Sequence, residues 1–364
     1  MRCQIAASIH EIDPERWDAL ADGEVAMSHR WQRAMEASQR RSQPRYVLLE
    51  DERGPLAAVV VNLAAAFGRV GWREALLRRL IVAVGATYSS RHCGIAIRAG
   101  ADRAGVLGRL DALLAGLSWR EAHPLVGIGN VLERDLPIWR ARGYLAARQR
   151  SFMVLDLDVE SYEQYLACLP KKDRGELRRV QRRAAEQGVE LSLEPLAGQG
   201  DQLYPLMAEI FARHGTPASA IPFTPALFPA IERELPGEAV VLSGKVDGQL
   251  AGFFLGVRQG DEMLWPAAGL HYELARPSCL YFVMLDQLIR WSIDQGIRRV
   301  YGGMTNEEQK ARHGFQPRAR WFCVRAYPGP LNRALGLAAA WRERSSRPTP
   351  VGTAQPSAAP AVGG

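Results

Sequence analysis

The sequence lacks the short motifs of several large enzyme classes. It contains no GxSxG elbow, no HExxH pair, no GxxxxGK[ST] phosphate loop and no GxGxxG turn between a strand and a helix. Each of these motifs places a nucleophile, a metal ion or a phosphate group in a fixed geometry. Their absence disfavours covalent serine chemistry, zinc-dependent hydrolysis and nucleotide hydrolysis.

Paired cysteines are absent as well. The five cysteines are scattered along the chain, they form no CxxC pair, and their number is odd. This pattern argues against a disulfide framework and a structural zinc site, and it favours a reducing compartment. We therefore predict a cytoplasmic protein with no bound metal.

Long apolar runs are also missing. The longest, residues 55–67, is shorter than the roughly 20 residues that a membrane-spanning helix needs, and Asn62 interrupts it. The N-terminus has no sustained apolar segment, because Gln4, His10 and Glu11 interrupt it, so we expect no secretory signal. The sequence thus predicts no membrane span.

The composition is that of an ordinary folded protein. The 364 residues are 47% hydrophobic and 23% charged, which allows sizeable cores, and the length favours two domains. The net charge of +7 comes mainly from arginine, which favours phosphate or carboxylate partners but is also typical of a GC-rich genome. Aromatic residues do not interleave with the most basic segment, so we expect no DNA partner.

Alternating helical and strand patterns predict an α/β (α+β) protein built from two similar units. The first covers residues 1–150 and the second covers residues 151–335. Residues 343–364 are rich in Ser, Pro, Ala and Gly, so this tail is expected to be disordered.

The second unit has the clearer pattern of elements. One helix is predicted over residues 161–188, where Gly188 stops it. Three strands follow further on, joined by turns at residues 246–248 and 259–261. A helix over residues 281–296 and a strand that ends at Gly303 complete the unit.

The most charged segment of the chain lies between Lys171 and Glu186. Arg174, Arg178 and Arg182 recur at helical spacing, so one helix face carries a dense positive stripe. Such a stripe suits the phosphates of a nucleotide, a carrier arm or an RNA. The alternative is a basic helix face that only water covers.

A second candidate segment follows the last of the three strands. A polar loop contains Tyr272 and Glu273, and Pro277 or Ser278 is placed to start the next helix. The free N–H groups of that helix could hold an anion or a polarised carbonyl. The alternative is an ordinary capped helix.

The third candidate is the polar turn GGMTNEEQKARHGF, residues 302–315. It contains Lys310, the only lysine after Lys245, in a protein that otherwise uses arginine. Glu307 and Glu308 lie close enough in sequence to pair with this lysine, so the turn is either part of a site or a polar surface loop.

The order of these segments resembles the Fem-type branch of the GNAT acyltransferase superfamily. The basic helix LPKKDRGELRRVQRRAAEQGVELSL is similar to the arginine-rich segment of that branch. The loop HGTP with FTPALFPAI, and the strands AVVLSGKVDGQLAGFFLGVRQGDEMLWPAAGLHYE, resemble the parts that follow. The most specific resemblance is the final block, RPSCLYFVMLDQLIRWSIDQGIRRVYGGMTNEEQKARHGFQP.

The resemblance implies two tandem GNAT-like domains and transfer of an acyl or aminoacyl group to a small-molecule or peptide amine. Acetyl-CoA-dependent members carry a Gln/Arg-x-x-Gly-x-Gly/Ala loop, whereas this chain reads ELARPSC there. The donor is therefore left open among acyl-CoA, a thioester on an acyl-carrier protein and aminoacyl-tRNA. It would act as a co-substrate, and the resemblance implies no tightly bound cofactor.

These segments supply a candidate for each task of acyl transfer. Lys310 is the candidate cation for an acyl carbonyl, a carboxylate or a phosphate. Tyr272 and Glu273, with Glu308 behind them, are the candidates for proton transfer. The candidate donor-binding residues are Arg174, Arg178, Arg182 and Ser278. The alternative function is a non-catalytic GNAT-fold protein that docks an anionic partner on its arginine-rich helix.

Overall fold

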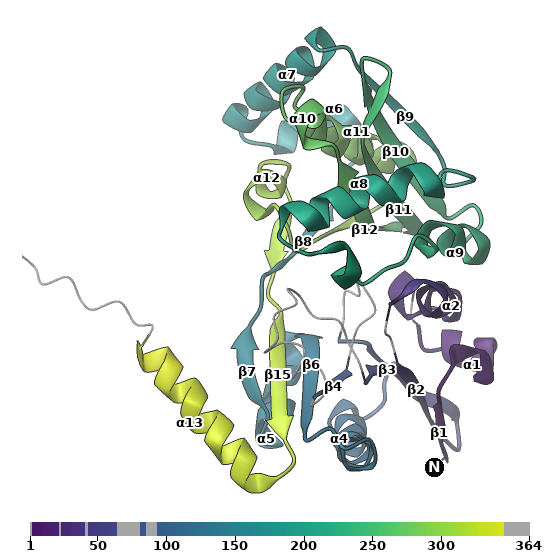
Figure 1. The fold of residues 1–364 in the computed structure, drawn as a ribbon, viewed down its shortest axis with the longest axis vertical. Helices are drawn as coiled ribbons and strands as arrows, with labels where there is room; N and C mark the ends of the chain where they lie inside the picture. Colours follow the sequence, from purple (N-terminus) through teal and green to yellow (C-terminus); the bar gives the residue numbers. More distant parts are fainter. Residues whose placement is uncertain (1, 22, 41–42, 64–80, 85–92, 346–364) are drawn as a thin grey trace, which may run out of the picture.

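The computed structural model describes residues 2–21, 23–40, 43–63, 81–84 and 93–345, with side chains up to residue 338. Two units are stacked along the long axis of the molecule, and each contains a sheet with helices against it (Figure 1).

The first sheet contains β1 (Arg2–Ala6), β2 (Pro44–Asp51), β3 (Gly54–Asn62), β4 (Ile81–Val84), β5 (Ile95–Ile97), β6 (Leu125–Val131), β7 (Leu145–Arg148) and β15 (Trp321–Ala326). The strand order is β1-β2-β3-β4-β6-β15-β7, and β5 pairs with β3. Strands β4 and β6 are parallel, so the sheet is mixed. The elements outside the sheet are η1 (Ile9–Glu11), α1 (Pro14–Asp18), η2 (Val25–Met27), α2 (His29–Ser38), α4 (Arg103–Arg120), η3 (Glu133–Asp135), α5 (Leu136–Ala141) and α13 (Gly329–Ser345).

The second sheet contains β8 (Phe152–Asp156), β9 (Val189–Pro195), β10 (Ala239–Val246), β11 (Gln249–Gln259), β12 (Glu262–Leu270), β13 (Arg299–Gly303) and β14 (Gln316–Arg318). Its order is β14-β8-β13-β12-β11-β10-β9, with β12 and β13 parallel. The elements outside it are α6 (Tyr162–Cys168), α7 (Lys171–Glu186), α8 (Gly200–Arg213), η4 (Ala218–Ala220), α9 (Leu227–Glu234), α10 (Tyr272–Ala275), α11 (Leu280–Asp294) and α12 (Glu307–Arg312). Two mixed sheets flanked by helices confirm the predicted fold class.

Local sequence explains the tight turns of the second sheet. Asp247 and Gly248 both have positive φ, as a two-residue hairpin turn of type I′ requires, and they join β10 to β11. Gly260, with φ of +58°, turns the chain between β11 and β12. The two predicted turns are therefore confirmed.

The helix predicted over residues 161–188 is wrong in one respect, because the structure divides it into α6 and α7. Leu169 adopts an extended conformation between them, and Pro170 precedes the first residue of α7. A proline disfavours helical geometry in the residue before it and has no N–H to donate, so the first helix ends here.

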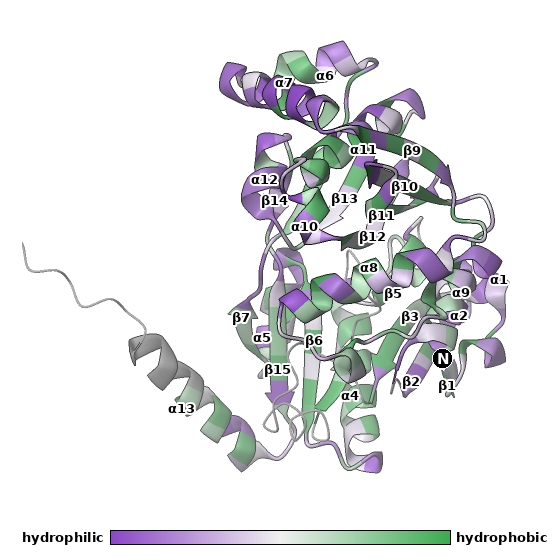
Figure 2. Ribbon diagram, turned by 45° about the horizontal axis from the view of Figure 1, so that its top comes forward, coloured by the Kyte–Doolittle hydropathy of each residue, from purple (hydrophilic) through white to green (hydrophobic). Residues whose placement is uncertain are grey.

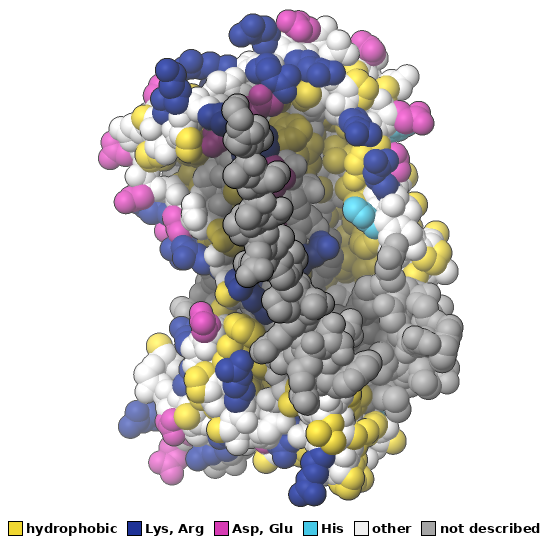
Figure 3. Space-filling view, turned by 90° about the vertical axis from the view of Figure 1, so that its left-hand side faces the viewer, with side chains coloured by type: hydrophobic (Ala, Val, Ile, Leu, Met, Phe, Trp, Pro, Cys, Tyr) yellow, Lys and Arg dark blue, Asp and Glu magenta, His cyan; other side chains and the backbone are white. Residues whose placement is uncertain are grey.

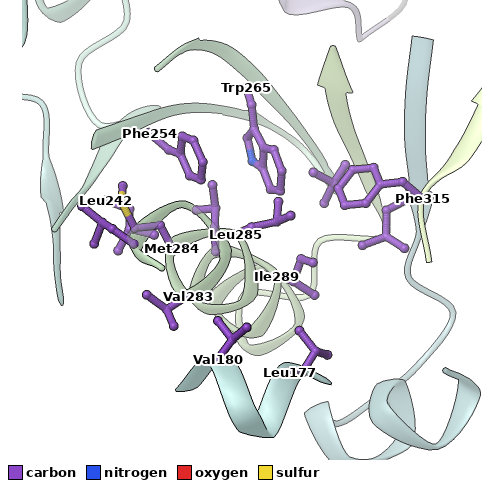
Figure 4. Close-up of a cluster of buried hydrophobic side chains, with 14 of the residues drawn as sticks. Leu177, Val180, Leu242, Phe254, Trp265, Val283, Met284, Leu285, Ile289 and Phe315 are labelled. Carbon is purple, nitrogen blue, oxygen red and sulfur yellow. The ribbon is translucent and has the colours of Figure 1, made fainter. Parts of the chain in front are cut away.

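The second sheet has a separate hydrophobic core on each face. Helices α6, α7 and α11 cover one face, where Trp265 lies between Phe254 and Phe315 (Figure 4). Helices α8 and α9 cover the other face. Helix α8 comes so close to β12 that a Cβ on Gly269 would lie 2.7 Å from Leu206 Cβ, so this position requires glycine.

Helix α2 joins the two units. It belongs to the first 150 residues, yet Trp31 and Met35 are buried in the core under α8 and α9 of the second unit. At the edge of this contact Arg30 makes a two-pronged ion pair with Glu238, at 2.5 and 3.3 Å. The units therefore share a core and are not connected only by a linker.

The chain returns to the first sheet after it has built the second. Strand β15 inserts between β6 and β7, with Val324 opposite both Gly127 and Leu145. The predicted second domain, 151–335, thus includes a strand and part of α13 that lie with the first unit. Of the predicted tail, residues 343–345 form the end of α13, and residues 346–364 lie outside the described residues.

Candidate functional site

Strands β12 and β13 separate part of the way along the second sheet. Their parallel pairing joins Glu262–Leu264 to Arg299–Tyr301, after which β12 continues to Leu270 while β13 ends at Gly303. In sheets with parallel strands, ligands bind outside the carboxyl ends of the strands, at the place where neighbouring connections diverge. We call the region around the ends of β12 and β13 the strand mouth.

Lys310 closes the turn on the β13 side of the strand mouth. Its ammonium group donates to the carbonyl of Gly302 and, at 2.7 Å, to the carbonyl of Thr305. The residue is 4% exposed, and burial lowers the pKa of Lys310 to about 8, although Glu307 opposes the shift. The residue therefore does not lie on a polar surface loop, and the charge of the lysine titrates near neutral pH.

Tyr281, in the first turn of α11, packs edge-on against Phe254, with 5.4 Å between the ring centres. Burial raises the pKa of the Tyr281 hydroxyl to about 12. Asn306, which begins α12 on the β13 side of the strand mouth, adopts a left-handed conformation with φ of +53°.

The β12 side of the strand mouth carries charged groups from α8. The backbone N–H of Tyr272 donates to Glu209 Oε1 at 3.2 Å, and the guanidinium of Arg213 lies over the Tyr272 ring, 4.1 Å from its centre. Glu273 is exposed and has no partner among the residues that the structure describes. Tyr272 and Lys310 thus lie on opposite sides of one region.

Two of the predicted site residues have local roles in the structure. The Glu308 side chain is 74% exposed and pairs with Arg312 at 2.7 Å. The Ser278 hydroxyl is buried and donates to the Leu274 carbonyl at 2.8 Å, so it does not cap the next helix. Cys279, with φ of +56°, precedes α11 instead, which corrects the predicted helix start.

The three predicted donor-binding arginines of α7 differ in their surroundings. Arg174 donates to the Leu169 carbonyl at 2.6 Å and thereby caps the last turn of α6. Arg178 and Arg182 are exposed, and neither has a partner in the described part of the chain. Helix α7 is hydrophilic on its outer side (Figure 2). The basic stripe predicted from the sequence is therefore present. Of its three arginines, Arg174 already uses one of its donors on the Leu169 carbonyl.

A buried polar cluster holds α6 and α7 against α11. Asp286 on α11 accepts from the Tyr162 hydroxyl at 2.5 Å and from Gln181 Nε2 at 2.7 Å. Nearby, the Tyr165 hydroxyl donates to the His313 carbonyl at 3.1 Å, which ties α6 to the end of α12. Helix α12, which carries Lys310, is thus anchored to α6 at its C-terminal end.

Sequence reasoning missed Glu209, Arg213, Tyr281 and Asn306. A signal was present for Glu209 and Arg213, because they lie four residues apart in the sequence and would share a face if that segment were helical. Asn306 precedes two glutamates, which is typical of a helix start. Nothing in the sequence pattern marks Tyr281, because its position follows from the packing of α11.

Other site types find little support in the part of the chain that the structure describes. No three His, Cys, Asp or Glu side chains there are grouped as metal ligands, and each helix there is too short or too polar to cross a bilayer. A cavity of about 20 Å³ at the other end of β12 is lined by residues that include Gln259 and Glu262. That volume holds about one water molecule.

The burial of Lys310 makes a prediction about stability. The pKa falls from its ordinary value of 10.5 to about 8 on folding. Between these values the unfolded chain binds the proton and the folded chain does not, so stability rises with pH. We therefore compare the free energy of unfolding in urea at pH 7.5 and at pH 10. From the lower to the higher pH, the value for wild type should rise relative to that for Lys310→Met by as much as about 3 kcal/mol. An equal difference at both pH values would contradict the burial of this charge.

Comparisons with known proteins agree with this architecture. Residues 171–311 match the family described as Acetyltransferase (GNAT) domain. FemX has a TM-score of 0.61 at 12% identity, over 92% of this chain and 100% of FemX. L-PGS from Bacillus licheniformis has a TM-score of 0.55 at 13% identity, over 91% of this chain and 96% of its own.

A tandem GNAT protein from the clavulanic acid biosynthesis pathway has a TM-score of 0.54 at 14% identity, over 89% of this chain and 98% of its own. The search of curated proteins finds no match. At these identities the solved structures establish the fold alone. The chain has a Fem-like tandem GNAT fold, and its second unit carries the match to the acetyltransferase (GNAT) domain.

Proposed function

We propose that this protein is an N-acyltransferase that moves an acyl or aminoacyl group from an activated donor to an amine. The observation that carries the proposal is the strand mouth itself. It lies inside the segment that matches the GNAT domain, residues 171–311, with Tyr272 after the end of β12 and Lys310 on the helix that follows β13. FemX and L-PGS share this fold, and this likeness supports the class of reaction. It leaves the substrates open.

The residues of the strand mouth can perform the tasks that acyl transfer requires. An ammonium group has three N–H donors, and Lys310 uses two of them on the Gly302 and Thr305 carbonyls. We assign the third to the acyl carbonyl oxygen, where negative charge develops during the reaction. Tyr272 and Glu273, at the end of β12, are our candidates for proton transfer. We assign no step to Glu308, because it pairs with Arg312.

The donor would bind through its phosphates on α7. Lysine and arginine side chains gather over the upper part of the face shown in Figure 3, where α7 lies, and the same face is hollowed between the two units. Acyl-CoA, a phosphopantetheine carrier and aminoacyl-tRNA all carry phosphates. The free positions Arg178 and Arg182 suit each of them.

Removing the two exposed arginines should weaken donor binding without unfolding the protein. We expect Arg178→Ala with Arg182→Ala to raise the dissociation constant of the donor about fivefold, and to reduce the salt dependence of binding when the donor is a tRNA. The matched control is Arg174→Ala on the same helix, which should instead cost about 1 kcal/mol of stability through the lost α6 cap. Unchanged donor affinity in the double variant would remove α7 from the site.

A direct test of the proposed function is transfer itself. Purified protein is incubated with acetyl-CoA, longer acyl-CoAs or a charged tRNA pool, together with a mixture of amines, and amide products are detected by mass spectrometry. We expect a new amide with one donor class. Binding of a donor without any amide product would favour the non-catalytic alternative.

A further inference from the structure

Helix α8 presents one carboxylate and one guanidinium to the same tyrosine. Glu209 and Arg213 lie one helical turn apart, where side chains of a helix are neighbours. Glu209 Oε1 accepts from the Tyr272 N–H at 3.2 Å, and Arg213 lies over the face of the Tyr272 ring at 4.1 Å. The two opposite charges therefore flank Tyr272 at the strand mouth.

The arrangement leaves both charges able to bind a ligand. Opposite charges four residues apart commonly pair, yet Glu209 and Arg213 form no ion pair with each other or with any other side chain that the structure describes. A guanidinium that stacks on a ring through its face keeps its N–H donors, which lie in its plane. A carboxylate that accepts one N–H through Oε1 keeps its second oxygen.

We propose that Glu209 and Arg213 form the acceptor subsite and select a small zwitterionic amine, such as an amino acid or an aminoalkyl phosphate. The ammonium group of the acceptor would lie at Glu209, and its carboxylate or phosphate would lie at Arg213. This inference rests on the proposed function, because only a transferase has an acceptor. It narrows the acceptor to amines that carry an anionic group nearby.

The charges of the subsite also define what it rejects. A diamine would place a second positive charge beside Arg213, which disfavours binding by repulsion. A neutral amine would leave Arg213 without a ligand. The negative charge of Glu209 and the positive charge of Arg213, one helical turn apart, thus complement a ligand whose ammonium and anionic groups are separated by a few bonds.

The reaction at this subsite accounts for all three protons of the acceptor ammonium. Glu273, one of the two candidates for proton transfer, takes one proton from the acceptor ammonium that Glu209 binds, and the freed electron pair of the nitrogen forms the bond to the acyl carbon. The C–S or C–O bond to the donor then breaks, and the leaving thiol or hydroxyl takes a second proton from the nitrogen. The third stays on the amide product.

Binding of matched amine pairs to donor-free protein tests the selectivity. We would titrate alanine against alaninamide, and aminoethyl phosphate against ethanolamine, by ligand-observed NMR. In wild type we expect the anionic member of at least one pair to bind about tenfold more tightly. The pair that shows the preference tells a carboxylate ligand from a phosphate ligand.

Two variants and a control locate the preference. Arg213→Met should abolish it, and Glu209→Gln should weaken both members of each pair. Arg120→Met replaces an exposed arginine in the last turn of α4, the position that Arg213 has in α8, and should change nothing. Equal binding within both pairs in wild type would overturn the inference, as would a preference that survives Arg213→Met.

The test separates this inference from the proposed function. If no donor supports transfer but the preference for anionic amines depends on Arg213, the subsite stands and the acyl-transfer proposal fails. If transfer occurs equally to alanine and alaninamide, and to aminoethyl phosphate and ethanolamine, the acyl-transfer proposal stands and the subsite inference is wrong.

Discussion

Replacing Lys310 with methionine should lower turnover by about 100-fold while donor affinity stays within a few-fold of wild type. Methionine fills similar space but cannot donate to the Gly302 and Thr305 carbonyls or to an acyl oxygen. Losing one donor to a developing oxyanion typically costs a factor of about 100 to 1000 in rate. Steady-state kinetics with the active donor, alongside a binding titration of that donor, would measure both quantities.

The pH dependence of turnover separates two roles for the lysine. If the ammonium stabilises the oxyanion, kcat/KM should fall as the pH rises through about 8, because the charge is lost there. If the neutral amine acted as a base, kcat/KM should rise through the same range. We expect the fall in wild type and its absence in Lys310→Met.

The control for Lys310 is Lys245, an exposed lysine on β10. Lys245→Met should leave turnover and its pH profile unchanged. Circular dichroism and thermal unfolding of both variants would show that the sheets still form. Full turnover in a folded Lys310→Met variant would remove this residue from the reaction.

Replacing Asp111 with alanine should destabilise the protein by about 3 kcal/mol. Asp111 on α4 accepts from the hydroxyls of Tyr144 and Tyr327, at 3.0 and 2.8 Å, and from Arg325 Nη1 at 2.9 Å. Arg325 lies on β15 and Tyr327 directly follows it, so these bonds fix the strand that returns to the first sheet. Alanine would remove the carboxylate from Arg325 and from both tyrosines, although the two hydroxyls keep their contact with each other and Tyr327 keeps the backbone carbonyl of residue 111. Losing a hydrogen bond to a charged group costs about 1.5 to 3 kcal/mol.

Urea unfolding measures the loss, and hydrogen exchange locates it. We expect the amides of β15 to exchange faster in Asp111→Ala, because the strand loses the contacts that hold its end. The matched control is Asp158→Ala, which removes a fully exposed carboxylate 3.5 Å from Arg298 and should cost under about 0.5 kcal/mol. Equal stability of the two variants would show that the returning strand is held by its backbone pairing alone.

Much of the second sheet follows from local sequence. Strands β10, β11 and β12 are bounded by Asp247-Gly248 and Gly260, whose positive φ values only a few residue types adopt readily. Helix α11 has the apolar spacing of a buried helix. These elements needed no tertiary information, so pattern and turn chemistry were sufficient to predict them.

The return of β15 could not be read from the sequence. A strand of six residues, Trp321–Ala326, pairs equally well with any free edge that its side chains fit, and the choice of β6 and β7 depends on the whole first sheet. The buried position of Lys310 was only partly predictable from the sequence. Its rarity singled it out, but its burial against the Gly302 carbonyl follows from the packing of Phe315 on that turn.

Hydrogen exchange with and without the donor that supports transfer tests the central claim most directly, because it locates the site without any substitution. Our account predicts slower exchange in residues 265–282 and 302–313, which surround the strand mouth, and in the exposed face of α7. Protection confined to the first unit, or to the small cavity at the other end of β12, would contradict it.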